Sequence, residues 1–368
     1  MSWSRNRNGV IFLHSSDELY GADRMLIRFI ESLPATVRAD VQVWLPTDIP
    51  GGPHLLCQEL IYRGIRVEHI NLPVLRRSYL NPLGLLLLAS RSLHTRRLLR
   101  DSRPRLVVLA TSALLPVAPI SPASARIVLH LQEIWHGVES KILSLLARRT
   151  RLIIAISAAA KASVSPGLQG RTVVVPNGTE DAPIGETVDQ HTGPLVFLIA
   201  SRWNSWKGHD VLLRAWRLAG EPGRLRILGG PPPVGAATDV PALVEAYGCT
   251  ESVEIVGEVD DIDQEIVAAD AMIVPSTQPE PFGLTSIEAF ARGRPVIGTN
   301  AGGLSDIVQE GAGWLVPPDD PDALAALLRN LSRAELAQAG QLARERFEKH
   351  YTLEIFRHRM RREIGSLS

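Results

Sequence analysis

Two carboxylates flank one predicted helix N-terminus in the second half of the chain. Glu280 lies in a loop broken by Pro281 and Gly283, and Glu288 takes an apolar-face position in the helix predicted over 284–291. A helix N-terminus attracts anions through its free N–H groups and its dipole. The two carboxylates could therefore hold hydroxyl groups of an anionic ligand, such as a sugar and a ribose. The alternative is an acid stabilised by the helix dipole and a buried glutamate paired with an arginine.

A pair of cations lies in the loop 201–208, between a strand predicted over 195–200 and a helix predicted over 211–218. Arg202 and Lys207 stand in this loop, and Lys207 is one of four lysines in a chain rich in arginine. A guanidinium and an ammonium at the carboxyl end of a strand suit a pyrophosphate whose leaving charge must be stabilised. The alternative is two solvated loop cations.

The first half of the chain holds two further candidates. His130 ends a strand predicted over 127–131 and is expected to face the cleft, where it could bind a sugar hydroxyl or the departing phosphate. The alternative is a buried, neutral histidine. Gly21 begins a predicted helix and would let a phosphate or a sugar approach the backbone, although an ordinary turn glycine fits equally well. The chain has no G-x-G-x-x-G segment, which argues against a nicotinamide or flavin enzyme.

These residues need a scaffold of parallel strands. Short apolar runs alternate with helical patterns, which predicts parallel sheets covered on both faces. The strands are predicted over 10–14, 41–45, 67–70, 106–109, 127–131, 152–156 and 173–175, and then over 195–200, 225–228, 253–256, 271–274, 296–298 and 314–316. The polar stretch 179–193 separates the two series and is the predicted linker. The expected fold is two doubly wound α/β domains facing one cleft.

Composition narrows the class of protein. A chain of 368 residues suits two domains, and its formal net charge of zero gives no support to a nucleic-acid binder. Cys57 and Cys249 are far apart, so no cysteine-based zinc site is expected and a reducing cytoplasm is the simple inference. No signal peptide is predicted, and no apolar run is long enough to span a membrane.

A basic, leucine-rich segment lies between Arg76 and Arg105. It holds eight arginines and the single acid Asp101, interleaved with leucines. Such a segment is typical of a helix that lies on an anionic membrane, in which case the acceptor would be lipid-linked. The alternative is a solvated helix face above a buried leucine stripe.

Several of these motifs resemble one known family. The segment EPFGLTSIEAFARGRPVI, followed by Gly302 and Gly303, closely resembles the signature of retaining family-four glycosyltransferases with the GT-B fold. SRWNSWKG resembles the family's segment with Arg and Lys, and GADR, IVLHLQE, PNG and the loop at Gly229 also resemble its motifs. The chain departs from many relatives at Ser201, where they have glycine, and at Gln132, where they have a second histidine.

The resemblance implies a GT-B architecture and a division of the chain. An acceptor domain is expected over 1–180, a linker over 181–193, a donor domain over 194–350 and a last helix over 351–368 that packs back on the first domain. The implied activity is metal-independent transfer of a hexosyl group from a nucleotide-diphosphate sugar to a hydroxyl acceptor, with retention and without a cofactor. A polysaccharide precursor or another lipid-linked glycan would be such an acceptor, for an enzyme in the cytoplasm or peripheral on the inner face of its membrane.

The resemblance also implies roles for individual residues. The expected catalytic residues are Glu280, His130, Lys207 and Arg202, and the expected donor-binding residues are Glu288, Gly283, Leu284, Thr285, Gly21 and Gly229, with no metal ligand. Two alternatives remain open: a GT-B nucleotide-sugar epimerase, and a catalytically silent nucleotide-sugar binder that would keep Arg202, Lys207 and Glu288.

Overall fold

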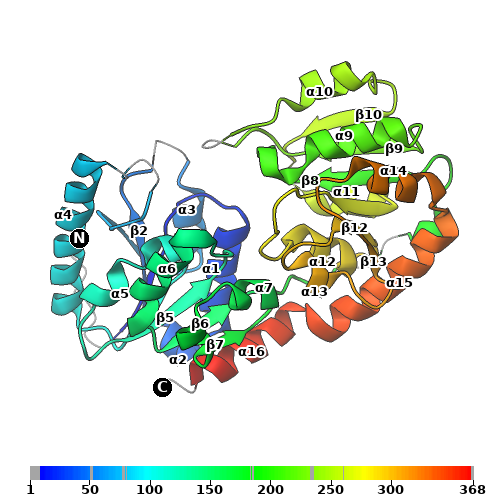
Figure 1. The fold of residues 1–368 in the computed structure, drawn as a ribbon. Helices are drawn as coiled ribbons and strands as arrows, with labels where there is room; N and C mark the ends of the chain where they lie inside the picture. Colours follow the sequence, from blue (N-terminus) through cyan, green and yellow to red (C-terminus); the bar gives the residue numbers. More distant parts are fainter. Residues whose placement is uncertain are drawn as a thin grey trace. The chain divides into compact units, whose positions relative to one another are not determined.

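The structure is a computed structural model that describes residues 9–49, 53–76, 79, 81–182, 184, 186–232, 236–259 and 261–365. The chain divides into two compact units (Figure 1). The first consists of Met1–Pro176 with Phe356–Ser368, and the second consists of Asn177–Ile355. Each unit has its own parallel β-sheet.

The sheet of the first unit has seven parallel strands in the order β3-β2-β1-β4-β5-β6-β7. Their bounds are β1 (Val10–Leu13), β2 (Val41–Pro46), β3 (Arg66–Ile70), β4 (Leu106–Leu109), β5 (Arg126–Leu131), β6 (Leu152–Ala155) and β7 (Thr172–Val174). Every residue of β1 and β4 is buried, as expected for strands covered on both faces. The order reverses between β1 and β4, where a doubly wound sheet opens a crevice at the carboxyl ends of its strands.

Helices cover both faces of this sheet. They are α1 (Gly21–Ser32), α2 (Ala35–Arg38), α3 (Leu55–Tyr62), α4 (Pro82–Ser102), α5 (Val117–Ile120), α6 (Gly137–Leu146), α7 (Ala158–Ala162) and α8 (Pro166–Gln169), with short 3-10 turns η2 (Ser112–Leu114) and η3 (Ala147–Arg149). The predicted start of a helix at Gly21 is confirmed. Phe29 of α1 packs edge-on against Phe12 of β1, with ring centroids 5.2 Å apart, and fixes this helix against the sheet.

The sheet of the second unit has six parallel strands in the order β10-β9-β8-β11-β12-β13. Their bounds are β8 (Val196–Ala200), β9 (Arg224–Leu228), β10 (Val253–Gly257), β11 (Ala271–Val274), β12 (Val296–Thr299) and β13 (Gly313–Val316). Here the order reverses between β8 and β11, which pair through Ala271 with Phe197 and Met272 with Leu198. The carboxyl ends of β8 and β11 therefore flank the expected ligand crevice of this unit.

The helices of the second unit follow the predicted alternation. They are α9 (His209–Leu218), α10 (Val240–Tyr247), α11 (Ile262–Ala268), α12 (Leu284–Ala291), α13 (Leu304–Ile307), α14 (Pro321–Asn330) and α15 (Arg333–His350), with 3-10 turns η4 (Val188–Gln190) and η5 (Ser205–Lys207). The helix α15 begins with a capping box, in which Ser332 and Glu335 cap each other.

Part of the predicted linker is folded onto the second unit. Val188 of η4 is buried in the core of that unit, and His191 Nδ1 lies 2.9 Å from the carboxylate of Asp270. Pro183 and Gly185 of the same stretch lie outside the described residues.

The last helix, α16 (Leu353–Gly365), returns to the first unit, as the family resemblance implies. Phe356 and Met360 are buried, and the Arg361 Nε donates a hydrogen bond of 2.7 Å to the Ser32 carbonyl at the end of α1. The predicted fold class, two doubly wound α/β sheets with a returning C-terminal helix, is therefore confirmed.

Candidate active site

The centre of the candidate site is a contact between two loops of the second unit. Lys207 lies at the end of η5, after β8, and Glu280 lies in the loop between β11 and α12. Lys207 Nζ donates to Glu280 Oε2 at 2.8 Å, with side chains that are 19% and 10% exposed respectively. These two residues, 73 positions apart in the chain, thus meet where the strand order reverses.

Two further contacts fix this ion pair. The buried Ser276 Oγ donates to the same Glu280 Oε2 at 2.9 Å. Lys207 Nζ also lies 4.1 Å from the centre of the Trp206 ring, which adds a cation–π contact. The ammonium is therefore held in one place at the carboxyl edge of the sheet.

Glycines allow the surrounding backbones to touch. Gly208 has a φ of 76°, and a Cβ added there would lie 1.9 Å from the Pro275 carbonyl oxygen. Gly302 has a φ of 69°, and an added Cβ would lie 2.2 Å from the Glu280 carbonyl oxygen, which also accepts a bond from Gly303 N–H. Neither position admits a side chain without displacing the loop that carries Glu280.

The helix α12 begins beside this ion pair. Gly283 is its N-cap with a φ of 101°, and an added Cβ would lie 3.8 Å from Glu280 Cγ. Leu284 and Thr285, the first two residues of the helix, are half-buried, while Glu288 is buried one turn further on. The carboxylate of Glu280 and the first N–H groups of α12 thus share one region, as the spacing predicts.

The loop after β8 also contacts the loop after β9. Trp203 N–H donates to the Gly230 carbonyl at 2.8 Å, and a Cβ added to Gly229 would lie 2.0 Å from the Ser201 carbonyl oxygen. Arg202 lies between these two anchored residues and is half-buried. The structure therefore gathers Lys207, Glu280, Gly283, Arg202 and Gly229 on loops at one edge of the second sheet.

His130 and Gly21 belong to the first unit. The side chain of His130 is fully buried and packs edge-on against Phe29 of α1, with ring centroids 5.4 Å apart. Its ring therefore lies against α1, and the expectation that it faces the cleft between the two domains stays a prediction. Burial and the neighbouring His14 lower the pKa of His130 to about 3, which keeps the ring neutral. Contact of this residue with a donor sugar stays a prediction.

A polar cluster that the sequence reasoning missed lies after β1 in the first unit. His14 Nε2 lies 2.7 Å from the Asp23 carboxylate, and Ser16 is hydrogen-bonded to the same carboxylate. Burial acts to raise the pKa of Asp23, but the hydrogen bond and charge of His14 hold it below its usual value. The sequence marks His14 only as the end of a strand, and no local spacing links it to Asp23.

A second polar group lies after β4 and β5. Ser112 donates from its Oγ to Glu133 at 2.7 Å and accepts from Trp135 Nε1 at 2.8 Å. Burial raises the pKa of Glu133. Together with the cluster around His14, these residues form a polar lining at the carboxyl edge of the first sheet, where a hydroxyl-bearing ligand would find donors and acceptors.

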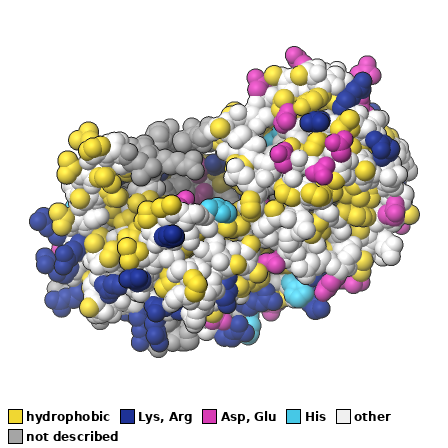
Figure 2. All heavy atoms as spheres, viewed as in Figure 1, with side chains coloured by type: hydrophobic (Ala, Val, Ile, Leu, Met, Phe, Trp, Pro, Cys, Tyr) yellow, Lys and Arg dark blue, Asp and Glu magenta, His cyan; other side chains and the backbone are white. Residues whose placement is uncertain are grey.

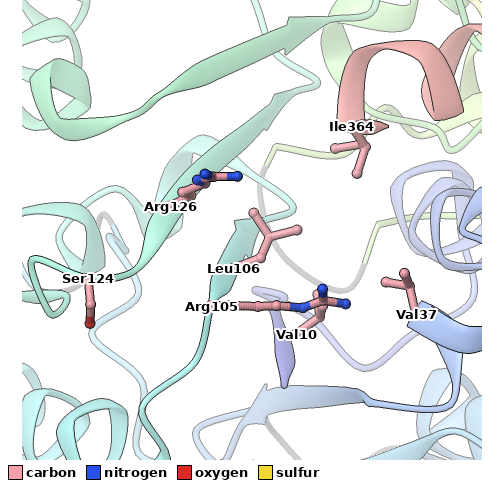
Figure 3. A pocket seen from close by; sticks show the side chains of 7 residues that line it. All are labelled: Val10, Val37, Arg105, Leu106, Ser124, Arg126 and Ile364. Atoms are coloured by element: carbon pink, nitrogen blue, oxygen red, sulfur yellow. The ribbon is translucent and has the colours of Figure 1, made fainter. Parts of the chain in front are cut away.

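One cavity of about 310 Å³ lies away from both sets of loops (Figure 3). Its lining includes Val10, Leu106 and Arg126, the first residues of β1, β4 and β5, with Arg105 and Ile364 beside them. It is therefore at the amino ends of the first sheet, opposite the edge where parallel sheets bind ligands, and it contains no predicted site residue.

A comparison with protein families gives a match within the second unit. Residues 194–334 match the family of glycosyl transferases group 1, and this segment contains the ion pair and α12. The matched residues all lie in the second unit.

Two curated glycosyltransferases are similar to part of the chain. The chain is 36% identical over 174 residues to D-inositol 3-phosphate glycosyltransferase 2 of Catenulispora acidiphila, covering 44% of this chain and 40% of the relative. It is 32% identical over 189 residues to the putative colanic acid biosynthesis glycosyltransferase WcaL of Escherichia coli, covering 47% of this chain and 45% of the relative. The matches thus span less than half the length of these two glycosyltransferases.

Solved structures match along almost the whole chain. Anabaena Alr3699/HepE in complex with UDP and glucose is similar with a TM-score of 0.76 and 22% identity, covering 98% of this chain and 100% of HepE. Sucrose-phosphate synthase of Thermosynechococcus elongatus is similar with a TM-score of 0.77 and 19% identity, covering 98% of this chain and 100% of that one. The likeness shows that the chain has the GT-B fold.

Proposed function

We propose that the protein transfers a sugar from a nucleotide-diphosphate sugar to a hydroxyl acceptor, with retention of anomeric configuration. The observation that carries the proposal is the Lys207–Glu280 pair at 2.8 Å, at the carboxyl edge where the second sheet reverses its strand order. A cation and an anion held together at such an edge suit a ligand that has a charged diphosphate next to a neutral sugar.

In the proposed reaction, the cations stabilise the departing diphosphate. Lys207 has three N–H donors, and its described hydrogen bond to Glu280 uses one of them. Arg202 lies in the same loop, and the first N–H groups of α12 follow Gly283. Positive charge from these three sources would offset the charge that develops as the bond between the anomeric carbon and the phosphate oxygen breaks, without requiring a metal ion.

The carboxylates would orient the neutral parts of the donor. Glu280 is set to accept hydrogen bonds from sugar hydroxyls, while Ser276 and Lys207 fix one of its oxygens. Glu288, one turn into α12, would hold the ribose. The acceptor hydroxyl attacks the anomeric carbon from the face that the phosphate leaves and gives up its proton to the departing phosphate, so Glu280 is not a covalent nucleophile.

UDP is the first nucleotide to test, because HepE was solved with UDP and glucose and with UDP-glucose. The acceptor class follows the curated relatives, whose names point to an inositol phosphate and to the polysaccharide colanic acid. We therefore propose a polyol or a polysaccharide precursor as acceptor.

The helix α4 favours an acceptor presented at a membrane surface. Leu83, Leu86 and Leu93 are 77%, 69% and 61% exposed, so the alternative of a buried leucine stripe fails for this part of the helix. Hydrophobic and basic side chains gather on different parts of α4 (Figure 2). No helix in the described part of the chain is both long and apolar enough to cross a bilayer.

Two of the eight arginines in the basic segment form ion pairs within the protein. Asp48 binds Arg76 at 2.8 Å and Arg91 at 2.7 Å, and Arg77 lies outside the described residues. Five arginines remain exposed: Arg96, Arg97, Arg100, Arg103 and Arg105. With the exposed leucines they would bind an anionic bilayer, each basic residue contributing about 1 kcal/mol. A cytoplasmic location, peripheral on the inner face of the membrane, stays a prediction.

The transfer proposal is tested by incubating the protein with UDP-, GDP-, ADP- and dTDP-sugars, with and without an inositol phosphate or a polyprenyl-linked sugar. Nucleotide release that requires an acceptor supports transfer, and binding without turnover supports a silent binder. A changed sugar on the nucleotide supports an epimerase. Lys207→Ala is expected to lower kcat by about 10²–10³-fold, and Lys349→Ala, on the exposed side of α15, is the matched control.

The membrane proposal is tested by flotation with vesicles that contain anionic lipid. The protein is expected to float with anionic vesicles and to be released from them by salt. With neutral vesicles it is expected to stay in the bottom fraction of the gradient. The double variant Leu83→Ser and Leu86→Ser is expected to lose this binding. If the protein floats equally with anionic and neutral vesicles, and if the double variant floats as wild type does, the proposal is overturned.

A further inference from the structure

Three potential metal ligands meet at the carboxyl edge of the first sheet. Asp17 lies in the loop after β1, His54 immediately precedes α3, and His69 lies near the end of β3. Asp17 Oδ2 is 2.6 Å from His54 Nδ1 and 2.8 Å from His69 Nε2. These residues are 37 and 52 positions from Asp17, so the fold rather than a local motif brings them together.

The carboxylate of Asp17 is fixed before any ion binds. Its side chain is fully buried, and Oδ1 accepts a hydrogen bond of 2.8 Å from the Cys57 N–H in the first turn of α3. That bond holds Oδ2 toward the two imidazoles. Orientation of a ligand by a second hydrogen bond is the usual support of a metal site.

The two histidines form an accessible rim around this carboxylate. Their side chains are 48% exposed for His54 and 35% exposed for His69, and the rings lie 5.4 Å apart at an angle of 77°. His54 has a φ of 49°, in the left-handed region that few residues other than glycine adopt. This backbone conformation directs the imidazole onto Asp17 at a cost in local strain.

We propose that Asp17, His54 and His69 bind one divalent transition-metal ion, with Zn²⁺ the best match. The three ligand atoms lie within 4.8 Å of one another, and a zinc ion takes nitrogen and oxygen ligands at about 2.0–2.2 Å. Two imidazoles and one carboxylate suit zinc better than magnesium or calcium, which prefer oxygen ligands.

Three protein ligands leave one coordination position open to water. The ion would link the loop after β1, the start of α3 and the edge strand β3. The inference goes beyond the proposed glycosyl transfer and does not rest on it, since the donor-site residues Lys207 and Glu280 lie in the second unit.

The test uses the full-length chain, stripped with a chelator, dialysed against Zn²⁺ and analysed for bound metal by mass spectrometry. The expected result is one Zn²⁺ per chain, with a matching rise in the thermal midpoint. Loading with Co²⁺ is expected to give visible d–d absorption from coordination by nitrogen and oxygen.

Two variants and one control decide where the metal binds. Asp17→Asn keeps an acceptor for the Cys57 N–H, and His69→Gln changes an exposed side chain, so both are expected to fold as wild type. Each is expected to weaken Zn²⁺ binding by at least about tenfold. The exposed His94 of α4 provides the control His94→Gln, which should bind zinc as wild type does.

The measured zinc content separates a specific site from a hydrogen-bonded cluster and from adventitious binding. If wild type binds no more zinc than Asp17→Asn, the three residues are only a hydrogen-bonded cluster and the proposal is overturned. If His94→Gln lowers zinc binding as much as His69→Gln does, the metal binds adventitiously to surface histidines, which also overturns it. Circular dichroism of the metal-free variants checks that any loss is not a loss of folding.

Discussion

Gly208 offers a direct test of how closely the two site loops approach each other. It joins Lys207 to α9 with a φ of 76°, and an added Cβ would lie 1.9 Å from the Pro275 carbonyl oxygen. Gly220 follows the other end of α9 with a φ of 78°, and an added Cβ there would have nothing within 4 Å. Alanine at either position would therefore cause similar backbone strain, and only at Gly208 would it also overlap with a neighbouring backbone.

The magnitude follows from this difference. Placing alanine in the left-handed region costs about 1–2 kcal/mol at either position. The overlap at Gly208 adds about 1–3 kcal/mol, because the loop after β11 must shift to make room. Gly220→Ala is therefore expected to destabilise the protein by about 1–2 kcal/mol, and Gly208→Ala by about 2–5 kcal/mol.

Urea unfolding followed by tryptophan fluorescence measures both variants, and nucleotide release measures their activity. Gly208→Ala is expected to lose activity as well as stability, since the displaced loop carries Glu280. Gly220→Ala is expected to keep its activity. If the two variants are equally stable and equally active, the loops do not touch as described.

Three further predictions concern single side chains. Lys207→Met leaves the carboxylate of Glu280, 10% exposed, without its cation and is expected to cost about 1–3 kcal/mol in urea unfolding; a cost below about 0.5 kcal/mol would contradict a fixed ion pair. Ser276→Ala removes one hydrogen bond to Glu280 and is expected to lower the free energy of unfolding by about 0.5–1.5 kcal/mol, measured in the same way. An unchanged free energy of unfolding would mean that this hydroxyl does not stabilise the carboxylate. His130 has a folded-state pKa of about 3, below its unfolded value of about 6.5. Because the unfolded chain takes up the proton first, the free energy of unfolding falls as the pH drops through this interval, by up to about 1.4 kcal/mol per pH unit. His130→Leu is expected to flatten that part of the stability profile, and an unchanged profile would refute the burial of a neutral imidazole.

The strands and their order of appearance could be predicted because each is a short, continuous apolar run. The predictions over 106–109 and 271–274 coincide with β4 and β11, and the helix predicted over 284–291 coincides with α12. The pairing of Lys207 with Glu280 could be anticipated only in outline. Lys207 follows β8 and Glu280 follows β11, and these two strands are adjacent in the sheet but far apart in the chain. The sequence suggests only that both loops lie at the carboxyl ends of strands, where ligands bind.

Other features could not be obtained from the sequence. The orientation of His130 depends on which face of β5 meets α1, and an apolar run buried on both faces does not encode that choice. The cluster of Asp17, His54 and His69 depends on the pairing of β3 at the sheet edge and on the left-handed backbone at His54. Neither has a local spacing that a motif could capture.

Binding of a diphosphate by Lys207 next to Glu280 is the central claim. Titration of wild type, Lys207→Ala and Lys349→Ala with UDP and with uridine, followed by calorimetry, tests this directly. Lys207→Ala is expected to weaken UDP binding by about tenfold or more, with uridine binding unchanged and Lys349→Ala equal to wild type. UDP binding that survives in Lys207→Ala, or a loss that extends equally to uridine, would contradict the assignment.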